Sequence, residues 1–286
     1  MLKKTLVALA ITATAFAAQA KETITVINPS NKASPATVFA KSIEEAISQG
    51  GKYNVEFYQA SSCADATKKY NSTKNAVVVG NADVNIAALS KKVECGFPAT
   101  AANTSMIAKS YLKICRKPNS KVDFGVSGRT TVGLASVINS QGLFDDMNQG
   151  KRQLVGVPYS GSKTVLAAVL AGDINWGIIG AGVVNEPEKR GEVVCEYDSD
   201  PRAKNFLGNT IKGMKVPTIP ILHYVSTNSK DAGIKAHVQA SMNGKALLET
   251  LDKKGFADVK TTGITAADTK AIESHINNTY KHYWSK

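Results

Sequence analysis

The chain has 286 residues, of which 43% are hydrophobic and 20% are charged, with 35 Lys and Arg residues against 23 Asp and Glu residues. A chain of this length and apolar content can bury a substantial core, which excludes intrinsically disordered, collagen-like and coiled-coil proteins. The net charge of +12 is compatible with nucleic acid, an anionic surface or an acidic small ligand as the partner, and does not choose among them.

The first twenty residues have the pattern of a secretory signal peptide. Lys3 and Lys4 precede an apolar run over residues 6–17, and Ala18-Gln19-Ala20 matches the small-x-small cleavage pattern. We therefore expect cleavage near Ala20 and an exported, soluble mature chain. This run and the later apolar stretches are shorter than the roughly 18 residues that a membrane-spanning helix needs.

Segments typical of strands and helices alternate through the first half of the mature chain. Residues 23–27 alternate polar and apolar side chains and predict a strand, a polar loop follows, and Pro35 opens an amphipathic helix that ends at Gly50-Gly51. The same reasoning predicts strands over residues 54–58, 76–79, 106–114 and 123–126, a short helix after Ser61-Ser62-Cys63, and a helix over residues 130–139.

The alternation continues in the second half of the chain. The expected elements are strands over residues 154–157, 176–179 and 193–197, and helices over residues 164–171, 183–190, 232–250 and 265–283. Repeated alternation of this kind predicts an α/β fold with mostly parallel sheets. Such sheets bind ligands beyond the carboxyl ends of their strands, which draws attention to the loops at residues 28–34, 61–63, 80–83, 127–131, 158–163 and 180–182.

The four cysteines suggest disulfides, because an exported protein meets an oxidising compartment. Their spacing matches no zinc-binding pattern. Three pairings are possible, and we favour Cys63 with Cys95 and Cys115 with Cys195. The alternative is that the cysteines are buried free thiols. Export and the dispersed basic residues also argue against nucleic acid as a partner.

Two of these loops combine hydroxyl side chains with the expected start of a helix, where free backbone N–H groups and the helix dipole favour anions. Ser127-Gly128-Arg129-Thr130-Thr131 offers backbone N–H groups, hydroxyl groups and the Arg129 guanidinium to a carboxylate. Simple capping of the helix by Ser127, with Arg129 pointing to water, also explains the pattern. Tyr159-Ser160-Gly161-Ser162-Lys163 repeats the arrangement with an aromatic ring added.

The sequence patterns that would indicate catalysis are weaker than these anion-binding patterns. Ser160 and Lys163 have the Ser-x-x-Lys spacing of penicillin-recognising acyltransferases, but the companion motifs are absent. The nucleophile-elbow motif G-x-S-x-G, the phosphate-binding motif G-x-x-x-x-G-K and the zinc-protease motif H-E-x-x-H are also absent from the sequence. The four histidines are scattered along the chain. We therefore expect no catalytic residue, no metal and no cofactor.

The order and content of these loops resemble those of a known family. The segment Val157-Pro158-Tyr159-Ser160-Gly161-Ser162, the helix and turn over residues 165–174, the exit Gly125-Val126-Ser127-Gly128 and the turn Val216-Pro217-Thr218 resemble the tripartite tricarboxylate transporter receptor (Bug) family. This family belongs to the type II periplasmic solute-binding proteins. The resemblance covers nearly the whole mature chain.

The resemblance implies a two-lobed fold, each lobe a mostly parallel sheet flanked by helices, with a ligand cleft between the lobes. Lobe 1 is expected over residues 21–112 plus 213–286, and lobe 2 over residues 113–212. The implied function is not enzymatic: a monomeric receptor captures a small carboxylate, or another anionic or zwitterionic solute, and delivers it to the permease subunits of a membrane transporter. The implied ligand-binding residues are Ser30, Asn31, Ser127, Thr130, Thr131, Tyr159, Ser160, Ser162, Gly180 and Ala181.

Two alternatives remain open at this point. One is a secreted serine acyl-transfer enzyme that uses Ser160 and Lys163. The other keeps the same fold as a sensor or adhesion module.

Overall fold

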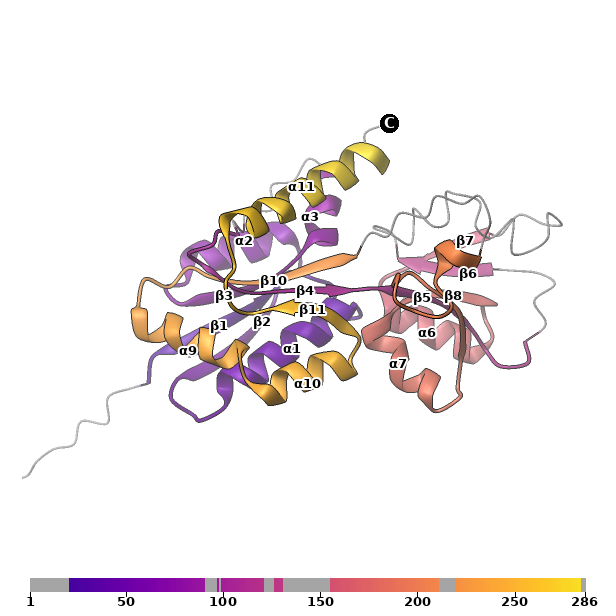
Figure 1. The fold of residues 1–286 in the computed structure, drawn as a ribbon, viewed down its shortest axis with the longest axis horizontal. Coiled ribbons are helices and arrows are strands. Elements are labelled where there is room, and N and C mark those ends of the chain that lie inside the picture. The colour runs from indigo at the N-terminus through magenta and orange to yellow at the C-terminus, as the bar shows by residue number, and fades with distance from the viewer. Residues whose placement is uncertain are drawn as a thin grey trace, which may run out of the picture.

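A computed structural model describes residues 21–90, 97, 99–120, 126–130, 155–210 and 220–283. The predicted signal peptide over residues 1–20 lies outside the described residues. Figure 1 shows two β-sheets side by side, each with its own helices. We call them the six-stranded unit and the five-stranded unit.

The six-stranded unit contains the beginning and the end of the described chain. Its strand order is β11-β4-β10-β3-β1-β2. The strands are β1 (Thr23–Asn28), β2 (Asn54–Gln59), β3 (Ala76–Asn81), β4 (Thr104–Ser110), β10 (Ile221–Thr227) and β11 (Phe256–Lys260). The helices are α1 (Pro35–Ser48), α2 (Cys63–Ser72), α3 (Ala82–Ser90), α9 (Ala232–Met242), α10 (Lys245–Lys253) and α11 (Ala266–Tyr283).

The five-stranded unit is formed by the middle of the chain, in the strand order β7-β6-β8-β5-β9. Its strands are β5 (Leu112–Arg116), β6 (Val126–Thr130), β7 (Val155–Tyr159), β8 (Trp176–Gly180) and β9 (Val194–Asp198). Its helices are α6 (Ser162–Ala171), α7 (Ala181–Lys189) and the short α8 (Leu207–Thr210).

The two units have separate hydrophobic cores. In the six-stranded unit, Phe39 and Ile43 of α1 and Val238 of α9 pack among fully buried strand residues. In the five-stranded unit, Val165 of α6 and Ile179 of β8 belong to a different cluster. Each sheet is thus stabilised mainly by the helices of its own unit.

The α/β class is confirmed, but the prediction of mostly parallel sheets is wrong. In the six-stranded sheet β1 is parallel to β2 and β3, whereas β10 is antiparallel to β3 and β4, and β11 is antiparallel to β4. In the five-stranded sheet β6 is parallel to β7 and β8, whereas β5 is antiparallel to β8 and β9. Of these strands, β5 follows the passage into the five-stranded unit and β10 follows the return from it, whereas β11 lies between α10 and α11 of its own unit.

The strand predicted over residues 106–114 is two strands in different sheets. β4 ends at Ser110 in the six-stranded sheet, and β5 begins at Leu112 in the five-stranded sheet. Tyr111 lies between them, and Figure 1 shows the chain running from one sheet into the other at this point. The sequence gives no sign of this change, because both strands are rich in apolar residues.

The long helix predicted over residues 232–250 is also divided. α9 ends at Met242 and α10 begins at Lys245, because Asn243 and Gly244 favour the helical conformation poorly. Within the described part of the chain, no helix is long and apolar enough to cross a membrane.

Candidate functional site

The parallel strands of the six-stranded sheet end in amide side chains. β1 ends at Asn28, β2 at Gln59 and β3 at Asn81. Carboxyl ends of parallel strands lie at one edge of a sheet, so this edge has a polar border. The predicted loop over residues 28–34 starts from it.

Asn28 and Gln59 fix the first residues of that loop. The Nδ2 atom of Asn28 donates to Oε1 of Gln59 at 2.9 Å, and Nε2 of Gln59 donates to the carbonyl oxygen of Ser30 at 2.6 Å. The backbone N–H of Ser30 donates to Oδ1 of Asn28 at 3.2 Å. Two neighbouring strands therefore hold both backbone polar groups of Ser30.

The hydroxyl of Ser30 is left without a partner. The residue is 2% exposed, and its Oγ has no hydrogen bond with the described residues. Ser34, the residue before α1, is only partly buried as a whole, but its Oγ is buried and also has no hydrogen bond with the described residues. A buried hydroxyl without a partner costs about 1–3 kcal/mol, so such groups are candidates for bonding to a ligand.

Asn31 is exposed and shapes the same loop. Its Oδ1 accepts from the backbone N–H of Ala33 at 2.8 Å, and its carbonyl oxygen accepts from Oγ1 of Thr37 at 2.8 Å. The predicted helix at Pro35 is confirmed, and these bonds set the path of the chain into it.

In the five-stranded sheet the predicted residues lie on three parallel strands. β6, β7 and β8 end at Thr130, Tyr159 and Gly180, and Thr130 is opposite Tyr159 in the register. Their carboxyl ends therefore share one edge. Thr131 lies outside the described residues.

The expectation that Ser127 lies at a helix entrance is wrong. Residues 126–130 form β6, in which Ser127 is opposite Gly156 of β7 and Trp176 of β8. Its backbone belongs to a strand paired on both sides, so it is not among the free N–H groups of a helix start.

Tyr159 is partly buried against the core of the five-stranded unit, whereas Ser160 is exposed. Oγ of Ser160 lies 3.4 Å from Oγ1 of Thr164, and the side chain of Lys163 is exposed. A serine nucleophile needs a base within hydrogen-bond reach, and the hydroxyl neighbour of Ser160 here is Thr164. The geometry therefore gives no support to the acyl-transfer alternative.

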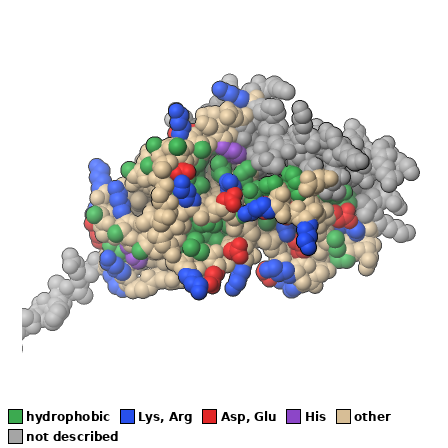
Figure 2. Space-filling view, in the orientation of Figure 1, with side chains coloured by type: hydrophobic (Ala, Val, Ile, Leu, Met, Phe, Trp, Pro, Cys, Tyr) green, Lys and Arg blue, Asp and Glu red, His purple; other side chains and the backbone are tan. Residues whose placement is uncertain are grey.

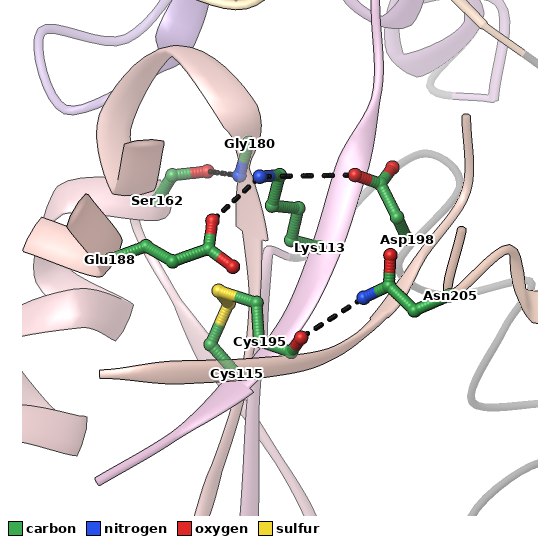
Figure 3. Close-up of a disulfide and its surroundings, with 8 residues drawn as sticks. All are labelled: Lys113, Cys115, Ser162, Gly180, Glu188, Cys195, Asp198 and Asn205. Carbon is green, nitrogen blue, oxygen red and sulfur yellow. Dashed lines mark hydrogen bonds and ion pairs between the residues drawn. A yellow bond between two sulfur atoms is a disulfide. The ribbon is translucent and has the colours of Figure 1, made fainter. Parts of the chain in front are cut away.

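Ser162, Gly180 and Ala181 lie together, close to the loop over residues 28–34 of the six-stranded unit. Oγ of Ser162 accepts from the backbone N–H of Gly180 at 3.0 Å, as Figure 3 shows. The N–H of Ala181 donates to the carbonyl oxygen of Tyr111 at 2.9 Å. These polar groups thus bond within the protein, and their role as ligand contacts stays a prediction.

The two predicted loops meet directly. The backbone N–H of Lys163, in the first turn of α6, donates to the carbonyl oxygen of Ala33 at 3.1 Å. The structure therefore brings the loop that carries Ser30 and Asn31 against the segment that carries Ser160 and Ser162.

Charged side chains near the carboxyl end of β8 form ion pairs. Nζ of Lys113 lies 2.6 Å from Glu188 and 3.9 Å from Asp198, as Figure 3 shows. Burial raises the pKa of Asp198, against the opposing effects of the Asp200 backbone N–H and of Lys113. In the described part of the chain, no group of three His, Cys, Asp or Glu residues is arranged to hold a metal ion.

One predicted disulfide is confirmed. Cys115 of β5 is bonded to Cys195 of β9, its neighbour in the sheet register (Figure 3). Cys63 is also disulfide-bonded. Its predicted partner, Cys95, lies outside the described residues, so that pairing stays a prediction.

Asn28, Gln59 and Ser34 have no ligand or positioning role in the sequence-based predictions, although these single out the loop over residues 28–34. The signal for the first two was present, since an amide residue directly follows the apolar part of each strand. Their role depends on the pairing of β1 with β2, and the sequence does not reveal that pairing.

The fold is that of periplasmic binding proteins. The structure is similar to that of the periplasmic binding protein BugD, with a TM-score of 0.69, 11% identity and coverage of 92% of this chain and 96% of the other. It is also similar to MatC from Rhodopseudomonas palustris with bound malate, with a TM-score of 0.63, 14% identity and coverage of 91% and 98%.

A third similar structure is R. palustris Rpa4515 with adipate, with a TM-score of 0.64, 15% identity and coverage of 91% of this chain and 95% of the other. Protein-family models gave no match to the sequence, and no curated protein matched it. The predicted resemblance to the Bug proteins is thus confirmed at the level of the fold.

Proposed function

We propose that this protein is a periplasmic receptor that captures a small carboxylate between its two units and delivers it to a membrane transporter. The fold it shares with a malate-bound protein and an adipate-bound protein supports this class of ligand. The observation that carries the proposal is the buried, unpartnered hydroxyl of Ser30, in the loop where the two units meet.

A carboxylate is the ligand chemistry that this edge fits. It accepts hydrogen bonds from hydroxyl and backbone N–H groups, and the dipole of α1 favours negative charge at the end where Ser30 and Ser34 lie. The net charge of +12, or +10 once Lys3 and Lys4 are removed with the signal peptide, acts in the same direction by attracting anions. Lys and Arg side chains are dispersed over the face drawn in Figure 2. This dispersion suits a general attraction of anions to the protein more than one concentrated anion-binding patch on this face.

We assign the ligand contacts to both units. The six-stranded unit contributes Ser30 and Asn31. The five-stranded unit contributes Thr130, Thr131, Tyr159 and Ser160, at or beyond the carboxyl ends of β6 and β7. We also keep Ser127 in this set, although it lies near the amino end of β6. The resemblance implies ligand contacts for Ser162, Gly180 and Ala181 as well. We instead assign these residues to holding this edge in place, because their polar groups bond within the protein.

Location and partners follow from the same proposal. Removal of residues 1–20 on export releases the mature chain into the periplasm, and the permease subunits of a transporter receive the solute from it. A sensor or adhesion module with this fold would bind a partner protein and show no affinity for carboxylates.

Titration calorimetry with malate and adipate on residues 21–286 tests the role of Ser30. Ser30→Ala should weaken the binding of the better of these two acids about tenfold or more, because a hydrogen bond to a charged group is worth about 1.5–3 kcal/mol. The ligand-free variant should be as stable as the wild type or up to about 1 kcal/mol more stable, since the substitution removes an unpartnered buried hydroxyl.

Ser229→Ala is the matched control. Ser229 is also 2% exposed, but its Oγ donates to Oδ1 of Asn75 at 2.9 Å. This variant should lose about 1–2 kcal/mol of unfolding free energy and keep the wild-type affinity. If Ser30→Ala instead loses stability and keeps its affinity, Ser30 has a purely structural role and the proposed site is wrong.

A further inference from the structure

Three glycines of the five-stranded unit lie against the other unit without a conformational reason to be glycine. Gly161 is extended, with φ at 175°, Gly180 has φ at −63°, and Gly182 is not among the glycines with positive φ. Any L residue adopts these conformations. The absence of a side chain at these positions therefore has another cause.

That cause is close contact with the six-stranded unit. A Cβ atom on Gly161 would lie 2.8 Å from the backbone of Ala33, and one on Gly182 would lie 2.9 Å from the carbonyl oxygen of Lys254. A Cβ atom on Gly180 would collide with Cγ of Pro35. The three contacting residues belong to the loop before α1, to the first turn of α1 and to the end of α10.

These contacts form one continuous surface, which we call the glycine seam: Gly161, Gly180 and Gly182 on one side and Ala33, Pro35 and Lys254 on the other. The hydrogen bond from Lys163 to Ala33 crosses it, and α1 contacts α7 along it. In Figure 1 both α1 and α10 lie on the side of the six-stranded unit that faces α7.

Other glycines of the protein show what differs at the seam. A Cβ atom on Gly177 would meet Val165, Val169 and Ile179, which all belong to the core of its own unit. Opening the two units would not relieve that contact. At the seam, by contrast, separating the units removes the collision entirely.

We propose that the glycine seam is the surface on which the two units close, and that its glycines set the ligand affinity without contacting the ligand. This inference rests on the proposed function for its ligand. The chain passes between the units at Tyr111, where β4 gives way to β5, and again between α8 and β10, and a rotation about both crossings would separate the two sides of the seam. A methyl group on any of the three glycines excludes the closed arrangement and leaves each unit intact.

The apparent affinity of a closing receptor falls in proportion to the fraction of closed protein. A seam variant that is closed one-tenth as often as the wild type therefore binds roughly tenfold more weakly. Gly182→Ala is the most informative case. In the first turn of α7 it should favour the helix by about 0.5–1 kcal/mol, and yet weaken closure.

The test uses residues 21–286 as wild type, Gly161→Ala, Gly180→Ala, Gly182→Ala and the control Gly177→Ala. Small-angle X-ray scattering without ligand measures the radius of gyration, and calorimetry with adipate and malate measures affinity. We expect each seam variant to have a larger radius than the wild type, about tenfold weaker binding and a nearly unchanged unfolding temperature. Gly177→Ala should unfold at a lower temperature with an unchanged radius.

A second substitution separates a seam effect from direct damage to the binding site. Pro35→Ala removes the Cγ atom that a side chain at residue 180 would meet. The double variant Gly180→Ala with Pro35→Ala should therefore recover the compact radius and most of the affinity. An unchanged radius in all three seam variants would overturn the inference, as would a loss of stability like that of Gly177→Ala.

The scattering and calorimetry measurements together distinguish a failure of this inference from a failure of the proposed function. If malate and adipate fail to bind the wild type but the seam variants expand, the proposed ligand is wrong and the seam stands. If the wild type binds and the variants bind equally well without expanding, the seam is wrong and the proposed function stands.

Discussion

His223 is a fully buried imidazole in the middle of the six-stranded sheet. It lies on β10, and its ring is 5.2 Å from that of Phe39 and 5.3 Å from that of Phe256, measured between centroids. A charged ring in such a position would lose its hydration without gaining an acidic partner.

The hydrogen bonds around the ring indicate the neutral form. Oδ1 of Asn81 accepts from the N–H of Val84, so its Nδ2 faces Nδ1 of His223, at 3.4 Å. Nδ1 therefore accepts, and Nε2–H donates to Oγ of Ser110, at 2.8 Å. Burial lowers the pKa of His223 from 6.5 to about 3.

This pKa makes the fold sensitive to acid. The unfolded imidazole binds a proton below pH 6.5 and the folded one only near pH 3, so the stabilising effect is complete above pH 6.5 and declines as the pH falls. Between pH 7 and pH 5, we expect His223 to reduce the unfolding free energy by about 2 kcal/mol. Urea denaturation at a series of pH values measures this slope.

The variant His223→Gln should flatten the dependence of the unfolding free energy on pH between pH 6.5 and 5. His275 adds a slope of the same sign, because burial lowers its pKa as well. As a check that needs no variant, the NMR signal of the His223 ring should not titrate above pH 4. A midpoint near pH 6.5 would contradict the account.

Single capping residues define where the helices of this protein begin. Asp231 precedes α9, and its Oδ1 accepts from the backbone N–H of Ile234 at 2.8 Å. Asp231→Ala should lower the unfolding free energy by about 1 kcal/mol, and Asp231→Asn should keep most of it, since an amide oxygen also accepts this bond. Equal urea midpoints for the two variants would show that the cap contributes nothing.

Elements with a local signal were predictable from the sequence. Pro35 at the first position of α1 and Ser62 before α2 mark helix starts, and Oγ of Ser62 accepts from the N–H of Asp65 as a cap should. Most of the predicted strands lie within a few residues of the observed ones.

Elements whose limits depend on distant contacts were not predictable. β10 has seven buried residues, and it is central only because β3 and β4 lie on either side of it. β11 adds an edge to β4 that the local pattern does not indicate. The division at Tyr111 likewise follows from the arrangement of two sheets and not from the residue itself.

The candidate site likewise has a part that was predictable from local sequence and a part that was not. The sequence indicated the loop of Ser30 and the segment of Tyr159 to Ser162 as separate places, each from its own composition. Their meeting at Ala33 and Lys163, and the amide side chains that fix Ser30, depend on the three-dimensional arrangement. The missing Cβ atoms of Gly161 and Gly180 have meaning only once the other unit is in place.

At the scale of the whole molecule, two units with separate cores are joined by the chain at Tyr111 and again between α8 and β10, and they meet along the glycine seam. This construction permits a rotation between the units, which is how two-unit receptors enclose a ligand. The loops that carry the proposed ligand contacts lie at the junction, so under the proposed function the solute would be bound and enclosed in the same motion.

The most direct test of a carboxylate receptor is thermal unfolding of residues 21–286 with malate, adipate and the uncharged diamide of adipic acid. A ligand that binds only the folded state at a hundred times its dissociation constant adds about 2.7 kcal/mol, which raises the unfolding midpoint by several degrees in a protein of this size. We predict a saturable rise with at least one of the two acids and none with the diamide. Equal midpoints with and without both acids, on a sample shown to be folded, would contradict the account.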